Sequence, residues 1–198
     1  MGVIKSAYEI AMENSKDIEA NKELVEANRF RDEGRRLVSK LLEDPSLDVK
    51  QALKGFEKSQ VGWVREGLIQ SLLANIVLPV DEFASRGTKR IGEAVAALVS
   101  DTRKISMIFS QLDGFFKEYV GERKRLAEAI ERQYAPKLKK KEEEMSRQLG
   151  RQVKINPSAD PEYQAMVRQY LSQLDAKYTD SLEGAKQEIR TVFAKTPA

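Results

Sequence analysis

Apolar side chains recur at three- and four-residue spacing over most of the second half of this 198-residue chain. One such stripe runs from Phe83 to Leu149, and a second runs from Tyr163 to Val192. This period puts side chains on one face of an α-helix, whereas a strand needs strict alternation. A helix of this length must bury its apolar seam against something. The pattern therefore predicts an all-α fold: an elongated helical bundle, or a coiled-coil-like hairpin of long helices.

The chain length fits a single all-helical domain over 1–198, without a second core. Ser6 and Glu9 have capping-box spacing, and Asn21 could cap a second helix. From these signals and the stripes we expect short N-terminal helices within 6–43, a core helix over 47–78, a long helical arm over 80–149, a loop over 150–160 and a C-terminal helix over 161–195.

Glycines and one proline interrupt the predicted helices. The core helix contains Gly55, Gly62 and Gly67. We favour a packed helix that tolerates these glycines; a close approach by a partner helix, or a break near 58–62, is the alternative. In the arm, Gly114, Gly121 and Pro136 predict one or two breaks. Pro136 removes an internal hydrogen bond and clashes with the preceding turn, so we expect a kink or a restart there.

The stretch "QLGRQVKINPSADPEY", residues 148–163, differs from the helical tracts on either side. Gly150 follows the last stripe residue and can end a helix in the left-handed conformation. Asp160 as N-cap and Pro161 at the first helical position predict the next helix start. Val153 and Ile155 alternate with polar residues as in a strand. We interpret 150–160 as a hairpin connection; because it is longer than most such connections, a binding loop stays open as an alternative.

The composition limits the kinds of catalytic and metal site that the chain can form, and it indicates a cellular location. There are no cysteines and no histidines, which excludes disulfides and removes the commonest general base and transition-metal ligand. We expect no catalytic residues, no metal, no cofactor and no enzymatic activity. The most apolar run, 67–80, is too short for a membrane span, which needs about 20 residues. Residues 1–20 carry no signal-peptide pattern, so we expect a cytoplasmic protein.

The function that these features favour is a structural or protein-interaction role, as a scaffold or adaptor that self-associates through its long apolar seams. We expect a homo-oligomer and an unknown protein partner. Several large side chains are candidate interface anchors, although core packing is the more common explanation for such residues. These candidates are Trp63, Phe116, Tyr119, Leu126, Ile130, Tyr163, Tyr170 and Tyr178.

A cluster of basic residues within 123–141 supports an alternative function, the binding of anionic surfaces of nucleic acid or membrane. The cluster comprises Arg123, Lys124, Arg125, Lys137, Lys139, Lys140 and Lys141. The glutamates at 142–144 follow it directly, and the net charge of the chain is only +3. Both facts argue against nucleic acid and membrane as partners.

Three segments carry a resemblance to a known family: "IKSAYEIAMENSKDIEANKE", "LLANIVLP" and "GRQVKINPSADPEY". They resemble a family of uncharacterised bacterial proteins, known only as a domain of unknown function, over most of the chain. The resemblance implies a bacterial, cytoplasmic, all-helical protein. It implies no activity, ligand or catalytic residue.

Overall fold

The computed structural model describes residues 7–44, 46–81 and 86–197. Over these residues the chain forms six α-helices, one 3-10 turn and no strand, which confirms the all-helical prediction. The helices are α1 Ala7–Glu43, α2 Val49–Leu53, α3 Lys58–Ala74, α4 Arg86–Leu98, α5 Thr102–Leu149 and α6 Pro161–Ala194, with the 3-10 turn at Pro157–Ala159.

The contacts divide the chain into two compact units, where the sequence suggested a single domain. Unit 1 comprises residues 1–76, 89–106 and 190–198, and unit 2 comprises residues 77–88 and 107–189. In unit 1 the apolar run that begins at Gly67 forms the centre of the core, as expected. Its fully buried side chains are Leu68, Leu72, Leu73 and Ile76.

The N-terminal region is one helix, so the prediction of two short helices is wrong. α1 continues through Asn21 as far as Glu43. The sequence from Ala7 to Glu33 has no glycine or proline, and an asparagine inside a helix costs only about 0.7 kcal/mol relative to alanine. A weak cap signal therefore does not end this helix. Ser6, proposed to cap it, and Phe83, proposed to begin the long stripe, lie outside the described residues.

α1 and α3 cross at very short range in unit 1. A Cβ atom added to Gly34 would lie 2.2 Å from the carbonyl oxygen of Val64, and one added to Gly67 would lie 2.0 Å from that of Arg31. Each glycine therefore faces the backbone of the other helix directly. Beside the crossing, Arg31 Nε donates to Glu66 Oε2 at 2.7 Å. The preferred interpretation of Gly67 as a tolerated glycine is thus wrong, and the alternative of a close helix approach is confirmed.

The predicted core helix over 47–78 is also interrupted. α2 ends at Leu53 and α3 begins at Lys58, with Gly55 in the connection. At the start of α3, Gln60 Oε1 accepts the backbone N–H of Glu57 at 3.2 Å, which satisfies a donor that the helix leaves open. The break lies a few residues before the 58–62 range that the sequence suggested.

The arm predicted over 80–149 is two helices, α4 and α5, which separate at 99–101. Asp101 Oδ1 accepts the backbone N–H of Lys104 at 2.9 Å and so caps α5. From Thr102, α5 is continuous through Gly114, Gly121 and Pro136. The expected restart at Pro136 is therefore wrong. Pro136 is exposed, so water can reach the backbone carbonyl that the proline leaves without its helical donor.

A buried guanidinium joins the end of α4 to the C-terminal segment of unit 1. Arg65, only 7% exposed, donates from Nη2 to the Leu98 carbonyl at 2.8 Å and from Nη1 to the Pro197 carbonyl at 2.7 Å. Its guanidinium lies over the ring of Phe193, 5.4 Å from the centroid. Burial lowers the pKa of Arg65. The negative end of the α4 dipole and the aromatic face stabilise the charge in place of a carboxylate.

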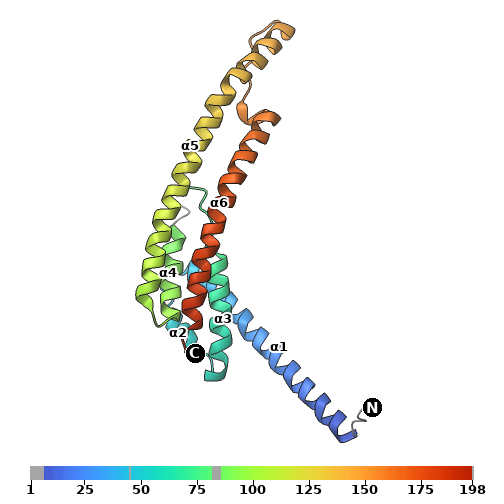
Figure 1. Ribbon diagram of the computed structural model, residues 1–198, viewed down its shortest axis with the longest axis vertical. Coiled ribbons are helices and arrows are strands. Elements are labelled where there is room, and N and C mark those ends of the chain that lie inside the picture. Colours follow the sequence, from blue (N-terminus) through green and yellow to red (C-terminus); the bar gives the residue numbers. More distant parts are fainter. Residues whose placement is uncertain (1–6, 45, 82–85, 198) are drawn as a thin grey trace, which may run out of the picture. The chain divides into compact units, whose positions relative to one another are not determined.

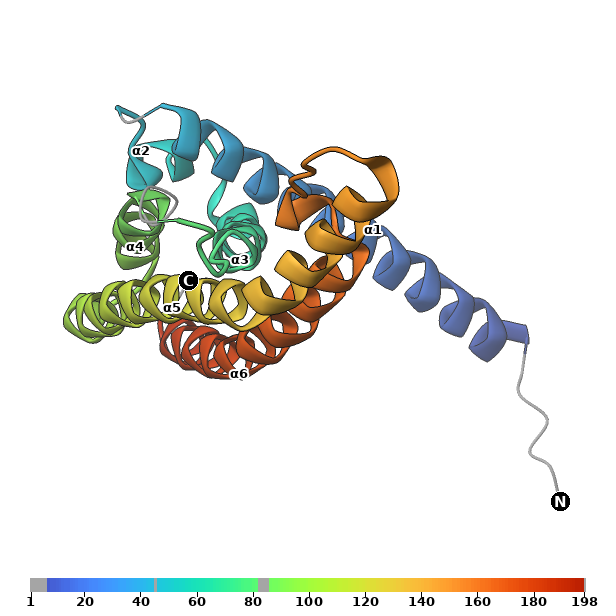
Figure 2. The same cartoon turned by 90° about the horizontal axis from the view of Figure 1, so that it is seen from above.

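Unit 2 is built on an antiparallel hairpin of α5 and α6, which lie side by side in both views (Figures 1 and 2). The stripe of each helix is buried against the other. The buried side chains along this seam include Leu112, Phe116, Tyr119, Ile130, Tyr134, Tyr178 and Leu182. No helix in the described part of the chain is both long enough and apolar enough to cross a membrane.

Candidate functional site

The end of the α5–α6 hairpin, residues 134–163 in unit 2, contains a group of connected polar contacts. α5 ends at Leu149, and the φ of 64° at the next residue, Gly150, is in the left-handed region that the sequence predicted for it. α6 begins with Asp160, whose Oδ1 accepts the backbone N–H of Glu162 at 3.0 Å. Both predicted signals are therefore confirmed, and together they fix the two ends of the connection.

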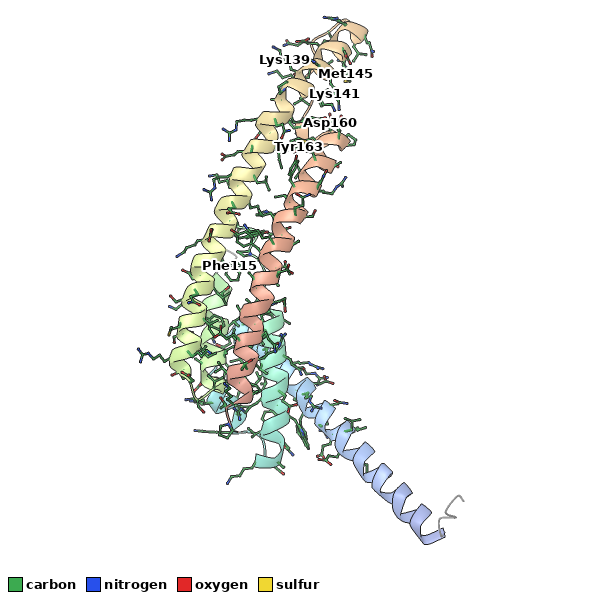
Figure 3. The ribbon with its side chains drawn as sticks, viewed as in Figure 1. Phe115, Lys139, Lys141, Met145, Asp160 and Tyr163 are labelled. Atoms are coloured by element: carbon green, nitrogen blue, oxygen red, sulfur yellow. The ribbon has the colours of Figure 1, made fainter. Side chains whose placement is uncertain are left out.

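Lys141 on α5 is the centre of this group (Figure 3). Its Nζ donates to Asp160 Oδ2 at 2.7 Å, to Glu162 Oε2 at 3.1 Å and to the Tyr134 hydroxyl at 2.9 Å. Lys137, one turn earlier on α5, also pairs with Glu162. Lys141 thus connects the last part of α5 to the first turn of α6.

Opposite charges hold the titratable groups of this cluster in their ionised forms. The Lys141 ammonium lowers the pKa of Asp160 to about 2, and the Lys137 ammonium lowers that of Glu162. The hydrogen bond to Asp160 raises the pKa of Lys141 in turn. General acid–base catalysis works best with a pKa near the operating pH. The pKa of Asp160 is lowered and that of Lys141 is raised, so both move away from neutral pH. The contacts of this cluster hold the first turn of α6 against α5.

The connection after Gly150 lies back along the final turns of α5. The Val153 N–H donates to Ser146 Oγ at 2.9 Å, and the Ile155 N–H donates to Glu142 Oε1 at 2.8 Å. The two acceptors are four residues apart, so they lie on one face of α5. Val153 and Ile155 are half-buried while Gln152 and Lys154 are exposed. This is the strand-like alternation that the sequence indicated.

Two apolar side chains remain exposed beside this connection. Met145 is 40% exposed and Leu149 is 54% exposed. Figure 3 shows Met145 beyond Lys141, toward the connection. The sequence placed both residues at the end of the buried stripe, which is wrong because α6 begins too late to cover them. The late position of Asp160 in the sequence is the signal that could have shown this.

The candidate interface residues are distributed over both units. Four of them are buried in the α5–α6 seam: Phe116, Tyr119, Ile130 and Tyr178. The hydroxyl of Tyr119 donates to Asp175 Oδ1 at 2.7 Å and accepts from Arg123 Nη1 at 2.8 Å. These four side chains are therefore occupied within the chain.

The other four candidates keep some exposure. Leu126 and Tyr163 are half-buried, and the Tyr163 ring lies 5.3 Å from that of Tyr134. Trp63, in unit 1, stacks on Phe30 at a centroid distance of 6.2 Å. Tyr170 is 37% exposed on α6. A role for these four at an interface stays a prediction.

The basic cluster within 123–141 is partly engaged by the chain itself. Arg123 contacts Tyr119, and Lys137 and Lys141 pair with the carboxylates at the start of α6. Lys124, Arg125, Lys139 and Lys140 are the exposed members apart from Lys137. Binding of anionic surfaces by this cluster stays a prediction, with four of its seven cations available for it.

We also searched the described residues for metal-binding groups and for cavities. No group of three or more Asp and Glu side chains among them could hold a metal ion. A cavity of about 230 Å³ in unit 1 lies between the end of α1, the start of α2, and α4. Its one cation, Arg90, donates from Nε to the Leu41 carbonyl at 2.8 Å and so caps the end of α1.

The comparisons with known proteins identify one family. The sequence pattern of a family of unknown function, DUF6657, matches residues 50–191. The comparisons with curated proteins and with solved structures give no match. The resemblance to an uncharacterised family, seen first in three short segments, is therefore confirmed, and a bacterial origin stays a prediction.

Proposed function

We propose that this chain, which belongs to the DUF6657 family, is a non-catalytic structural adaptor that self-associates through an exposed face of α1. The observation that carries the proposal is the length of α1 relative to the helix that packs on it. α1 has 37 residues and α3 has 17, which correspond to about 55 Å and about 25 Å at the rise of an α-helix. α1 therefore continues past α3 in unit 1 (Figures 1 and 2).

The burial of the described α1 side chains agrees with this length difference. The first buried residue along the helix is Ala27 and the last apolar one is Leu41. Just before Ala27, Leu24 is 57% exposed and Val25 is 65% exposed. In proteins most of the stability of a helix comes from the packing of one of its faces rather than from helix propensity. Packing against another helix would stabilise the part of α1 that α3 does not reach.

A second copy of the chain is the partner that the exposed face favours. A surface groove of about 350 Å³ follows this face and is lined by Val25, Asn28, Arg29, Asp32, Glu33 and Arg36. The lining has two cations and two anions, so it is complementary to itself in a two-fold contact.

The test is the oligomeric state of the full chain, measured by sedimentation equilibrium at tens of micromolar. We expect a dimer for the wild type and a monomer for the double variant Leu24→Glu, Val25→Glu. Both substituted side chains are exposed, so the fold of unit 1 should persist. The matched control, Met145→Glu with Leu149→Glu, places two charges at exposed apolar positions of unit 2 and should remain a dimer. A monomeric wild type, or an α1 variant that stays dimeric, would overturn the proposal.

A further inference from the structure

Residues 152–156 have one hydrogen-bonding edge in use and one open. The N–H groups of Val153 and Ile155 donate to side chains of α5. In an extended chain, successive residues direct their peptide groups to opposite edges. The peptide groups of Gln152 and Lys154 therefore point away from α5, and neither forms a hydrogen bond within the described part of the chain. The segment is a short, strand-like edge that a helix holds in place.

Such an edge is preorganised for pairing with another extended chain. An exposed edge presents a row of unpaired N–H and C=O groups, which is a template for an added strand. Hydrogen bonds to Glu142 and Ser146 already hold the segment against α5, so an incoming strand does not have to order it. Asn156 and the following Pro157–Ala159 turn end the edge on one side, which limits the pairing to a few residues.

The charges around the edge select the partner. Residues 137–154 contain seven Lys and Arg against three Glu. Lys137 and Lys141 pair with carboxylates of α6, and Glu142 accepts the Ile155 N–H. The exposed remainder has five cations and two anions: Lys139, Lys140, Arg147, Arg151 and Lys154 against Glu143 and Glu144. A second copy of the edge would place Lys154 near like charges, which opposes pairing between copies.

We propose that residues 152–156 are a docking edge for an extended, acidic segment of a partner protein, added as a strand. Main-chain hydrogen bonds would come from Gln152 and Lys154, while the surrounding cations would select acidic side chains. The exposed Met145 and Leu149 would contact an apolar residue of the partner. This assigns the binding role that the sequence left as the alternative for the loop, and it is independent of self-association through α1.

The experiment uses the full chain and a fluorescein-labelled peptide in which Glu and Asp alternate with Val and Ile. Binding is measured by fluorescence anisotropy against the counterpart with lysine at every acidic position. On the protein, Lys154→Gln and Lys154→Pro form a matched pair. Both remove the charge, but only the proline removes the outward N–H. A peptide N-methylated at alternate amides tests the same hydrogen bonds with the protein unchanged.

We expect binding of the acidic peptide that weakens with salt, and no binding of the lysine peptide. Lys154→Gln should weaken binding a few-fold, and Lys154→Pro by about tenfold more, because an unmade backbone bond is added to the lost charge. One of the two N-methylated registers should fail to bind.

Equal affinity of the Gln and Pro variants, with both N-methylated peptides still bound, would overturn strand pairing. Absence of binding by the acidic peptide, or binding only to vesicles of phosphatidylcholine with phosphatidylserine, would overturn the acidic protein partner. None of these results depends on the oligomeric state, so failure here and failure of the α1 contact are distinguishable.

Discussion

Substitution of Gly67 by alanine should destabilise unit 1, although alanine is the better helix former. The added Cβ would lie 2.0 Å from the carbonyl oxygen of Arg31 and 2.7 Å from its carbonyl carbon. Ordinary van der Waals contact begins at 3.4 Å, so α1 and α3 would have to separate by more than 1 Å. The obstructing atoms belong to a helix backbone, which cannot rotate away as a side chain would.

Two opposing terms set the size of the effect. The gain in helix propensity is about 1 kcal/mol in favour of alanine. Overpacking a core costs about 1–3 kcal/mol, and more where the neighbour is rigid. Separation of the helices would also lengthen the contact of Arg31 with Glu66, now 2.7 Å. Because the obstructing atoms are backbone, we expect the overpacking cost at the upper end of this range, with a net loss of about 2 kcal/mol in the free energy of unfolding.

Urea denaturation followed by tryptophan fluorescence measures this change where it occurs. Trp63 is the only tryptophan of the chain, and it lies on α3 against Phe30 of α1. The matched control is Gly114→Ala in α5, where an added Cβ meets nothing within 4 Å. There the propensity gain acts alone, so circular dichroism should show stabilisation by about 1 kcal/mol. If Gly67→Ala proves as stable as the wild type, the close crossing of α1 and α3 is wrong.

Two further predictions concern protonation in unit 2. The pKa of Asp160 is lowered from 3.8 to about 2, so its carboxylate stabilises the fold above pH 3.8 and loses that contribution as the pH falls through 2. Asp160→Asn should lower the thermal midpoint at neutral pH, and the difference from wild type should shrink by pH 2; a constant difference would contradict the Lys141 contact. Burial raises the pKa of Tyr178 from 10 to about 12, so its neutral phenol stabilises the fold below pH 10 and loses that contribution as the pH rises through 12. Alkaline unfolding, followed by circular dichroism, should therefore be less steep in Tyr178→Phe, and identical profiles would argue against burial of this hydroxyl.

Local chemistry explains which parts of the structure the sequence could predict. The left-handed Gly150 and the N-cap at Asp160 depend on a residue and its immediate neighbours, and both are as expected. The same is true of the helical periods, because the spacing of apolar residues alone defines a buried face. The α5–α6 hairpin follows from these signals without knowledge of any distant contact.

Long-range contacts explain most of what the sequence could not predict. From the sequence alone, Gly67 weakens a helix without any visible reason. The reason is the backbone of Arg31, which is 36 positions earlier in the sequence and packs directly against Gly67. A second reason is solvent exposure, which the sequence does not give. Pro136 predicts a helix break, but it is exposed on α5, so water can replace the lost hydrogen bond. The separation of α4 from α5 could have been predicted from a local signal, because Asp101 directly precedes α5 and caps it. The prediction missed this cap because the apolar spacing continues across it. The polar contacts of Lys141 join two helices and had no signature in either one.

The location expected for self-association also changes once the packing is known. The sequence placed it on the apolar seams of 83–149 and 163–192, but in unit 2 residues such as Phe116 and Tyr178 already bury these seams against each other. α1 differs, because α3 uses its apolar face only from Ala27 onward. The groove left on α1 contains one valine among balanced charges. A contact of that composition gains little from apolar burial and depends on ion pairs, which salt screens. A dimer formed there should therefore be reversible and weaker at high ionic strength, unlike one formed through a buried apolar seam.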